Sequence, residues 1–153
     1  MFRHVTAAAA CLLMTCSALQ AQDRTVGDLT IHDPVIVKSF ASARSAGGYM
    51  AITNQGHQPE HLVGIRVEGP MAMIHESREE DGVMRMVHLD AVEIPAGETV
   101  TFRPGGLHVM IMRLKPDDLP LGGTLDAVLS FAREGDVAVT FEVVDRSESG
   151  HTN

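Results

Sequence analysis

Short runs of alternating apolar and polar residues, separated by turn residues, make up most of this chain. Breaks such as Asn54-Gln55-Gly56 and Asp81-Gly82 carry the Gly, Asn and Asp residues typical of tight turns. No stretch shows a convincing helical period, and strands of this number and spacing predict an all-β domain, a β-sandwich or a small Greek-key barrel. The expected strands span residues 29–37, 48–53, 62–67, 71–75, 83–89, 99–102, 107–114, 124–131 and 137–144.

The first residues have the order of a secretory signal: a positive charge, an apolar block over 5–14, and then small and polar residues. The apolar block is too short to span a bilayer. Cleavage is expected after Ala18 or after Ala21, and we place the signal peptide at residues 1–21. The expected mature chain is then a β-domain over 22–145 followed by a flexible polar tail over 146–153.

Both cysteines of the chain, Cys11 and Cys16, lie inside this signal. A lipid-anchored form that starts at Cys16 is an alternative, but Met14-Thr15 is a poor match to the small residues that usually precede such a cysteine. The mature protein should therefore contain no thiol. An exported protein meets an oxidising compartment, where thioethers resist loss better than a lone thiolate does.

The net charge limits the classes of partner. The 153 residues carry a net charge of −8, and loss of Arg3 with the signal would leave −9. Such an acidic surface argues against nucleic acids and against anionic membrane surfaces as partners.

Three segments of the chain place His and Met at alternate positions. Because successive side chains on a strand point to opposite faces, each triplet would line up its ligands on one side of a strand. Imidazole and thioether groups together suit Cu(I) better than Mg, Ca or Mn, which prefer oxygen. The triplets therefore predict a copper-binding β-domain. They are Met71-x-Met73-x-His75, Met84-x-Met86-x-His88 and His108-x-Met110-x-Met112.

The spacing between triplets resembles a known family. Ten residues separate His75 from Met86, twenty-one separate Met86 from His108, and one separates His108 from Met110. This is similar to the H-x10-M-x21-H-x-M signature of the periplasmic copper chaperones called PCuAC proteins. Similar segments extend over roughly residues 30 to 144, which is nearly the whole mature domain.

The resemblance implies a cupredoxin-like β-barrel that holds one Cu(I) at an exposed site formed by His75, Met86, His108 and Met110. It also implies delivery of copper to an acceptor such as the CuA site of cytochrome c oxidase. The chain departs from the family pattern at Glu76, where many relatives have a second Met. Its tail offers only His151 towards the additional Cu(II) site that some relatives carry.

The remaining His and Met residues are expected to have ordinary roles. Met71, Met73 and Met112 are expected to be core packing, since Met is a common core filler. Met84 could either line the copper site or support it. For His88 we favour a solvated strand position over an extension of the ligand face. Surface positions in or near turns are expected for His32, His57 and His61.

Enzyme chemistry finds no support in the sequence. Without cysteine the mature chain can form neither a blue-copper site nor a thiol–disulfide centre. His75-Glu76 lacks the second His of a zinc protease helix, and no Gly-x-Ser-x-Gly elbow is present. We expect a non-enzyme that passes copper on by ligand exchange. The alternatives are a periplasmic copper storage or buffering protein and a non-catalytic protein-interaction module, which copper stoichiometry would distinguish.

Overall fold

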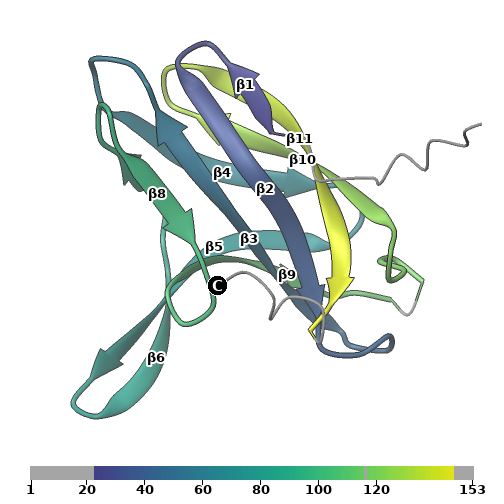
Figure 1. Cartoon of the computed structure of the whole chain (residues 1–153). Coiled ribbons are helices and arrows are strands. Elements are labelled where there is room, and N and C mark those ends of the chain that lie inside the picture. The colour runs from purple at the N-terminus through teal and green to yellow at the C-terminus, as the bar shows by residue number, and fades with distance from the viewer. Residues whose placement is uncertain (1–22, 116, 147–153) are drawn as a thin grey trace, which may run out of the picture.

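Eleven strands make up the fold in the computed structural model, which describes residues 23–115 and 117–146 (Figure 1). The expected signal peptide lies outside the described residues, as does all of the expected tail except Arg146. Within the described part of the chain, no helix is long and apolar enough to cross a membrane. The strands are β1 (Arg24–Val26), β2 (Leu29–Lys38), β3 (Ser45–Asn54), β4 (Glu60–Val67), β5 (Met71–Glu80), β6 (Val83–His88), β7 (Val92–Ile94), β8 (Thr99–Phe102), β9 (Leu107–Met112), β10 (Thr124–Phe131) and β11 (Gly135–Asp145).

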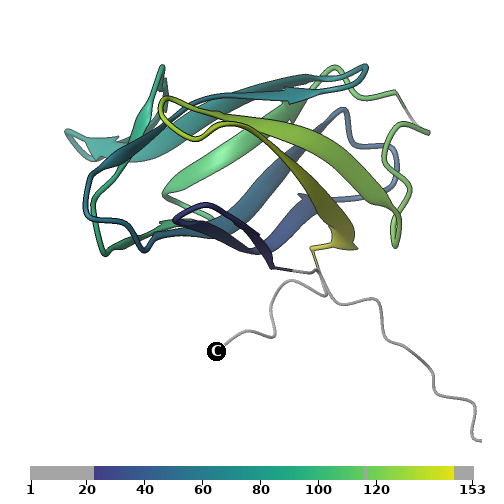
Figure 2. The same ribbon diagram turned by 90° about the horizontal axis from the view of Figure 1, so that it is seen from above.

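The strands follow the order β6-β5-β9-β3-β2-β11-β10-β4-β7, with β1 beside β2 and β8 beside β3. All pairs are antiparallel except β11 with β2, which run parallel. β3 pairs with β9 through Ser45–Gly48 and with β8 through Met50–Thr53, so one long strand serves two parts of the sheet. The sheet folds over so that β4 packs near β5, and the two layers enclose the core (Figure 2). The prediction of an all-β, cupredoxin-like Greek-key architecture is confirmed.

Alternation along β5 and β9 decides which side chains face the core. Ile74 on β5 and Val109 and Ile111 on β9 are at most 3% exposed and belong to the central apolar cluster. Because side chains alternate between the two faces of a strand, the residues between them point to the outer face of the sheet. The His and Met residues of the triplets occupy these outer positions.

The hairpin of β5 and β6 differs from the expected strands, because β5 continues to Glu80 instead of ending at His75. Residues 77–80 are polar and extend beyond the core, so no apolar alternation marks them as strand. Asp81 and Gly82 both have positive φ, at 53° and 76°, as the favoured two-residue hairpin turn requires. The tight turn expected at Asp81-Gly82 is confirmed, and the hairpin that it forms between the first two triplets projects from the body of the protein (Figure 1).

Two short strands were also missed. β1 and β7 each contain only three residues, too few for an alternating pattern to stand out from a loop.

Candidate metal centre

Three histidines form a row across neighbouring strands. His75 on β5 pairs with His88 on β6 and with His108 on β9. Directly paired residues share a face, so all three rings lie on the outer side of the sheet. The ring centre of His75 lies 5.6 Å from that of His88 and 6.0 Å from that of His108. Two imidazoles that share one metal ion have ring centres up to about 6.4 Å apart, given metal–nitrogen bonds of about 2 Å. Either pair is therefore close enough to chelate one ion.

His108 is fixed in an orientation suited to metal binding. Its side chain is buried, and its Nδ1 lies 2.9 Å from the carbonyl oxygen of Gly106. A carbonyl oxygen can only accept a hydrogen bond, so Nδ1 carries the hydrogen and donates it. The lone pair of the neutral ring is then on Nε2. Histidine ligands are typically held in this way by a hydrogen bond from the other ring nitrogen.

His75 carries a buried nitrogen that lacks a partner. Among the described residues, its Nδ1 is the one buried side-chain nitrogen or oxygen with no hydrogen bond. Buried polar atoms are nearly always satisfied, so such an atom needs an explanation. Burial lowers the pKa of His75, and the neighbouring His108 and His88 lower it further. These effects favour the neutral form of the ring, which can ligate a metal.

The lowered pKa of His75 predicts a loss of stability in acid. Because its pKa lies below the unfolded value of about 6.5, the unfolded chain binds the proton more tightly. This contribution is fully present above about pH 6.5 and is lost as the pH falls through the folded-state pKa. Urea unfolding of the metal-free protein between pH 7.5 and 4.5 should show a smaller acid loss for His75→Gln than for the parent. The exposed His57→Gln is the matched control, and overlapping profiles for His75→Gln and the parent would contradict this assignment.

Met110 and Met86 flank His75 on opposite sides. Met110 follows two residues after His108 on β9, and Met86 precedes His88 by two residues on β6. Both are thus diagonal to His75 on the same face, at the spacing of about 7–8 Å that long side chains can bridge. Met86 pairs with Ser77 and is 52% exposed.

Small neighbours leave space for the Met86 thioether. Ser77 stands opposite Met86, and its N–H donates a hydrogen bond to the carbonyl of Gly106, which directly precedes β9. Neither residue has a side chain large enough to separate Met86 from the histidine rings. The sheet register therefore places the other three ligand candidates, Met86, His108 and Met110, next to His75.

His88 occupies an exposed strand position, as expected from the sequence, and it also lies beside His75. Its side chain is half exposed and lies 3.5 Å from the Asp90 carboxylate, and its ring centre lies 5.6 Å from that of His75. A two-residue turn at Asp81-Gly82 pairs residue 75 with residue 88, so the turn itself was the signal. Met84, in contrast, pairs with Glu79 one step further towards the hairpin tip, away from the histidine row.

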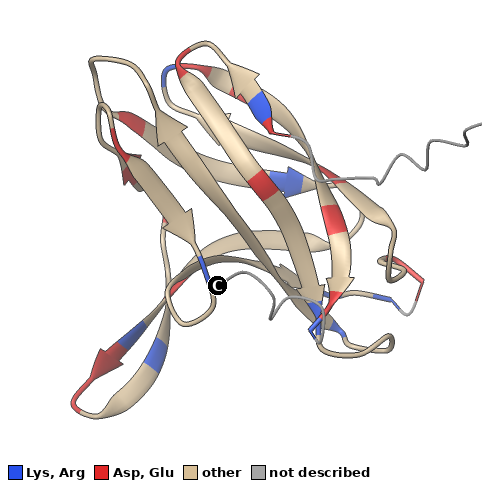
Figure 3. Cartoon of the chain, viewed as in Figure 1, with Lys and Arg blue, Asp and Glu red and all other residues tan. Residues whose placement is uncertain are grey.

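The charged residues and most of the thioethers lie in different parts of the β5–β6 and β9 region. No three His, Cys, Asp or Glu side chains within residues 23–115 and 117–146 are grouped so that they could hold a metal ion. The charged residues of the β5–β6 hairpin gather towards its tip, whereas β9 carries none (Figure 3). The thioether groups beside His75 and His108 favour a soft ion.

Comparison with solved structures shows the same fold in PCuAC domains. The copper-bound PCuAC domain from PmoF2 superposes with a TM-score of 0.68 at 23% identity, covering 81% of this chain and 98% of that domain. The solution structure of apo-DR1885 from Deinococcus radiodurans gives 0.58 at 27% identity and covers 96% of this chain and 99% of that one. The solution structure of CuI-DR1885 from the same organism gives 0.54 at 29% identity, with coverages of 85% and 84%.

Sequence comparison gives the family. No curated protein sequence matches the chain. The family model of the LpqE-like lipoproteins matches residues 29–143. This range contains all three His/Met triplets, the strands β2 to β10 and most of β11. The chain therefore belongs to the LpqE-like lipoprotein family.

Proposed function

We propose that this protein is a copper chaperone that binds one Cu(I) through His75, Met86, His108 and Met110. The observation that carries the proposal is the unpartnered, buried Nδ1 of His75 in the middle of a face lined by imidazoles and thioethers. We call these four residues the mixed site. The similarity to DR1885, solved in a form described as CuI-DR1885, supports copper as the cargo.

The ligand set suits a carrier rather than a permanent metal centre. Two neutral imidazoles and two thioethers bring no negative charge, so the bound Cu(I) keeps its positive charge. Cysteine thiolates in an acceptor would neutralise that charge and bind the soft ion more tightly. Copper would therefore move from the mixed site to a thiolate-bearing acceptor by exchange of one ligand at a time.

Exposure suggests the order of that exchange. Met86 is 52% exposed on the projecting hairpin, whereas His108 is only 7% exposed and is held by the Gly106 carbonyl. An incoming ligand can reach and replace Met86 without moving the body of the sheet. We propose that Met86 is released first and His108 last.

We also propose where the exchange takes place and which kind of site receives the copper. The expected signal peptide would export the protein to the periplasm, and the family match to lipoproteins fits an exported protein. The resemblance to PCuAC proteins supports an acceptor such as the CuA site of cytochrome c oxidase. We propose no catalytic reaction, since ligand exchange requires none.

The role of Met86 is tested by anaerobic titration with Cu(I) against a chromophoric chelator. Met86→Leu should weaken tight Cu(I) binding by about tenfold or more, because it removes a soft ligand. The side chain is exposed, so the free energy of unfolding should change by no more than about 0.5 kcal/mol. Met84→Leu is the matched control, because Met84 is 60% exposed on the same strand and faces Glu79. Equal affinities of the Met86→Leu variant and the parent would refute the assignment.

The same titration separates the alternative functions. A tight equivalent that depends on the mixed site supports the chaperone. Several weakly held ions with no tight one would favour copper storage or buffering. No competition with the chelator at all would favour a protein-interaction module.

A further inference from the structure

A second group of thioethers lies beside the mixed site. Met71 and Met112 are direct partners in the β5–β9 ladder, and Met73 is the partner of Met110 in the neighbouring row. All four residues are on the outer face, on the side of the histidine row opposite to Met86. We call Met71, Met73 and Met112 the methionine triad, since the mixed site already uses Met110.

The triad does not pack the core, contrary to the sequence expectation. The core positions on these strands belong to Ala72, Ile74, Val109 and Ile111, which alternate with the methionines. The triad residues are each only partly buried. Met50, in comparison, is a genuine core methionine that is 3% exposed. Apolar packing into the interior therefore does not explain why three thioethers occupy outward positions.

The geometry lets the three sulfur atoms meet. Paired residues on one face have Cβ atoms about 4.5–5.5 Å apart, and residues two apart on a strand are neighbours on the same face. Methionine has three rotatable side-chain bonds, so its sulfur can adjust to a common partner. Met71 and Met112 form the direct pair, and Met73 is adjacent to Met71 and diagonal to Met112.

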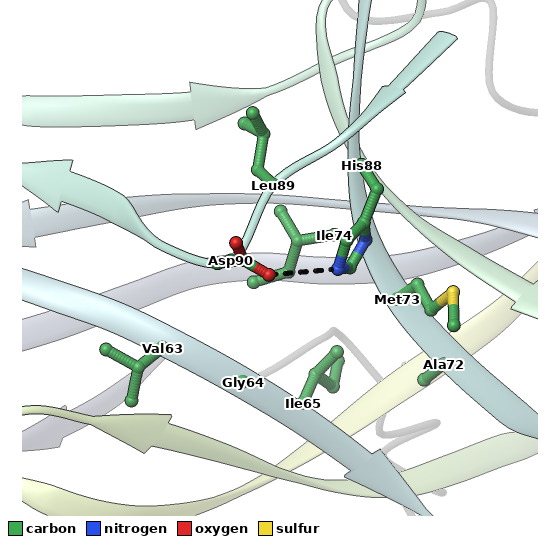
Figure 4. A pocket seen from close by; sticks show the side chains of 9 residues that line it. All are labelled: Val63, Gly64, Ile65, Ala72, Met73, Ile74, His88, Leu89 and Asp90. Carbon is green, nitrogen blue, oxygen red and sulfur yellow. Dashed lines mark ion pairs between the residues drawn. The ribbon is translucent and has the colours of Figure 1, made fainter.

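A small neighbour and a cleft border the triad. Met112 faces Ser45 on β3, whereas Met110 faces Gly47, where the Tyr49 side chain fills the space above the backbone. On the other side Met73 lines a cleft of about 260 Å³ between β4 and β5, which it shares with His88 (Figure 4). An ion can therefore approach the sulfur atoms from solvent.

We propose that the methionine triad is a second Cu(I) site, held by thioethers alone. For the identity of the metal this inference rests on the proposed function. A neutral all-sulfur set selects soft monovalent ions such as Cu(I) and has no affinity for the oxygen-seeking Mg or Ca ions. Met110 lies between the triad and His108, so copper could pass from one site to the other by exchange at a shared thioether.

The experiment is an anaerobic Cu(I) titration of the mature chain with competing chelators of graded strength. The parent should bind one tight and one weaker equivalent. Met71→Leu/Met73→Leu/Met112→Leu should lose the weaker equivalent and keep the tight one. His75→Ala/His108→Ala should lose the tight equivalent and keep the weaker one. Met50→Leu is the matched control for a Met-to-Leu change, and circular dichroism checks that each variant is folded.

The outcomes separate this inference from the proposed function. If the parent binds a single equivalent that the histidine variant loses, or if the triple variant keeps both equivalents while the histidine variant loses the tight one, the triad is not a site and the chaperone proposal stands. If the triple variant loses one equivalent but the histidine variant loses none, the triad binds copper and the mixed site is wrong. Loss of neither equivalent from either variant overturns both.

Discussion

Replacement of His108 by alanine is expected to cause the largest loss of Cu(I) affinity among single substitutions in the mixed site, on the order of 100-fold or more. Changes in groups that merely orient a ligand cost about 10- to 100-fold, and His108 is itself a proposed ligand. It is also the least exposed member of the mixed site, and its hydrogen bond to the Gly106 carbonyl presets Nε2 for the metal. The His108 ring then needs little reorganisation to bind the metal. Alanine removes both the ring and its fixed orientation. Competition with a chromophoric chelator at a fixed free Cu(I) concentration measures the effect.

The control for this prediction is His88→Ala. His88 has the same side chain in the same row and contacts His75, but it is half exposed and is not a member of the mixed site. Its replacement should change Cu(I) affinity much less. Since His108 is buried, His75→Ala serves as a second test that does not depend on how well His108→Ala folds. Unchanged affinity in both His75→Ala and His108→Ala would rule out the mixed site.

The sequence predicted the fold class because alternation and turn chemistry are local signals. Asp81-Gly82 indicated a tight turn, and the two positive φ angles there confirm it. The extension of β5 through Glu80 could not be predicted in this way, because a hairpin that projects into solvent buries no apolar face. The lengths of strands were thus predictable where they cover the core and not where they leave it.

The candidate site, too, could be predicted from the sequence only in part. Alternation alone indicated that His and Met residues share a face within each triplet. Which residues meet between triplets depends on strand register, and the pairing of β5 with β9 is a long-range contact that no local pattern specifies. Composition also suggested that Met71, Met73 and Met112 were core packing, because Met is usually apolar filler. Only the identity of the neighbours, Ile74 and Ile111, shows which face of each strand is buried.

Replacement of Phe141 by alanine is expected to cause the largest loss of stability, about 3–5 kcal/mol, because it opens a cavity in the core. Phe141 lies on β11 and is fully buried. A loss of this size is a large part of the roughly 5–15 kcal/mol that stabilises a typical domain. Urea unfolding of the metal-free protein measures it. The matched control is Phe40→Ala, because Phe40 is 59% exposed and its loss should cost far less.

Copper should raise the stability of the Phe141→Ala variant and of the parent by the same free energy. A ligand that binds only the folded state stabilises it by an amount set by its free concentration and its Kd alone. In the sheet order β2 and β3 separate β11 from β9, so a cavity at Phe141 should leave the geometry around His108 unchanged. Repeating the unfolding at one buffered Cu(I) concentration gives the gain for each protein. A smaller gain for Phe141→Ala would mean that core packing sets the affinity of the mixed site, whereas equal gains would show that the β-barrel frame and the metal ligands contribute independently.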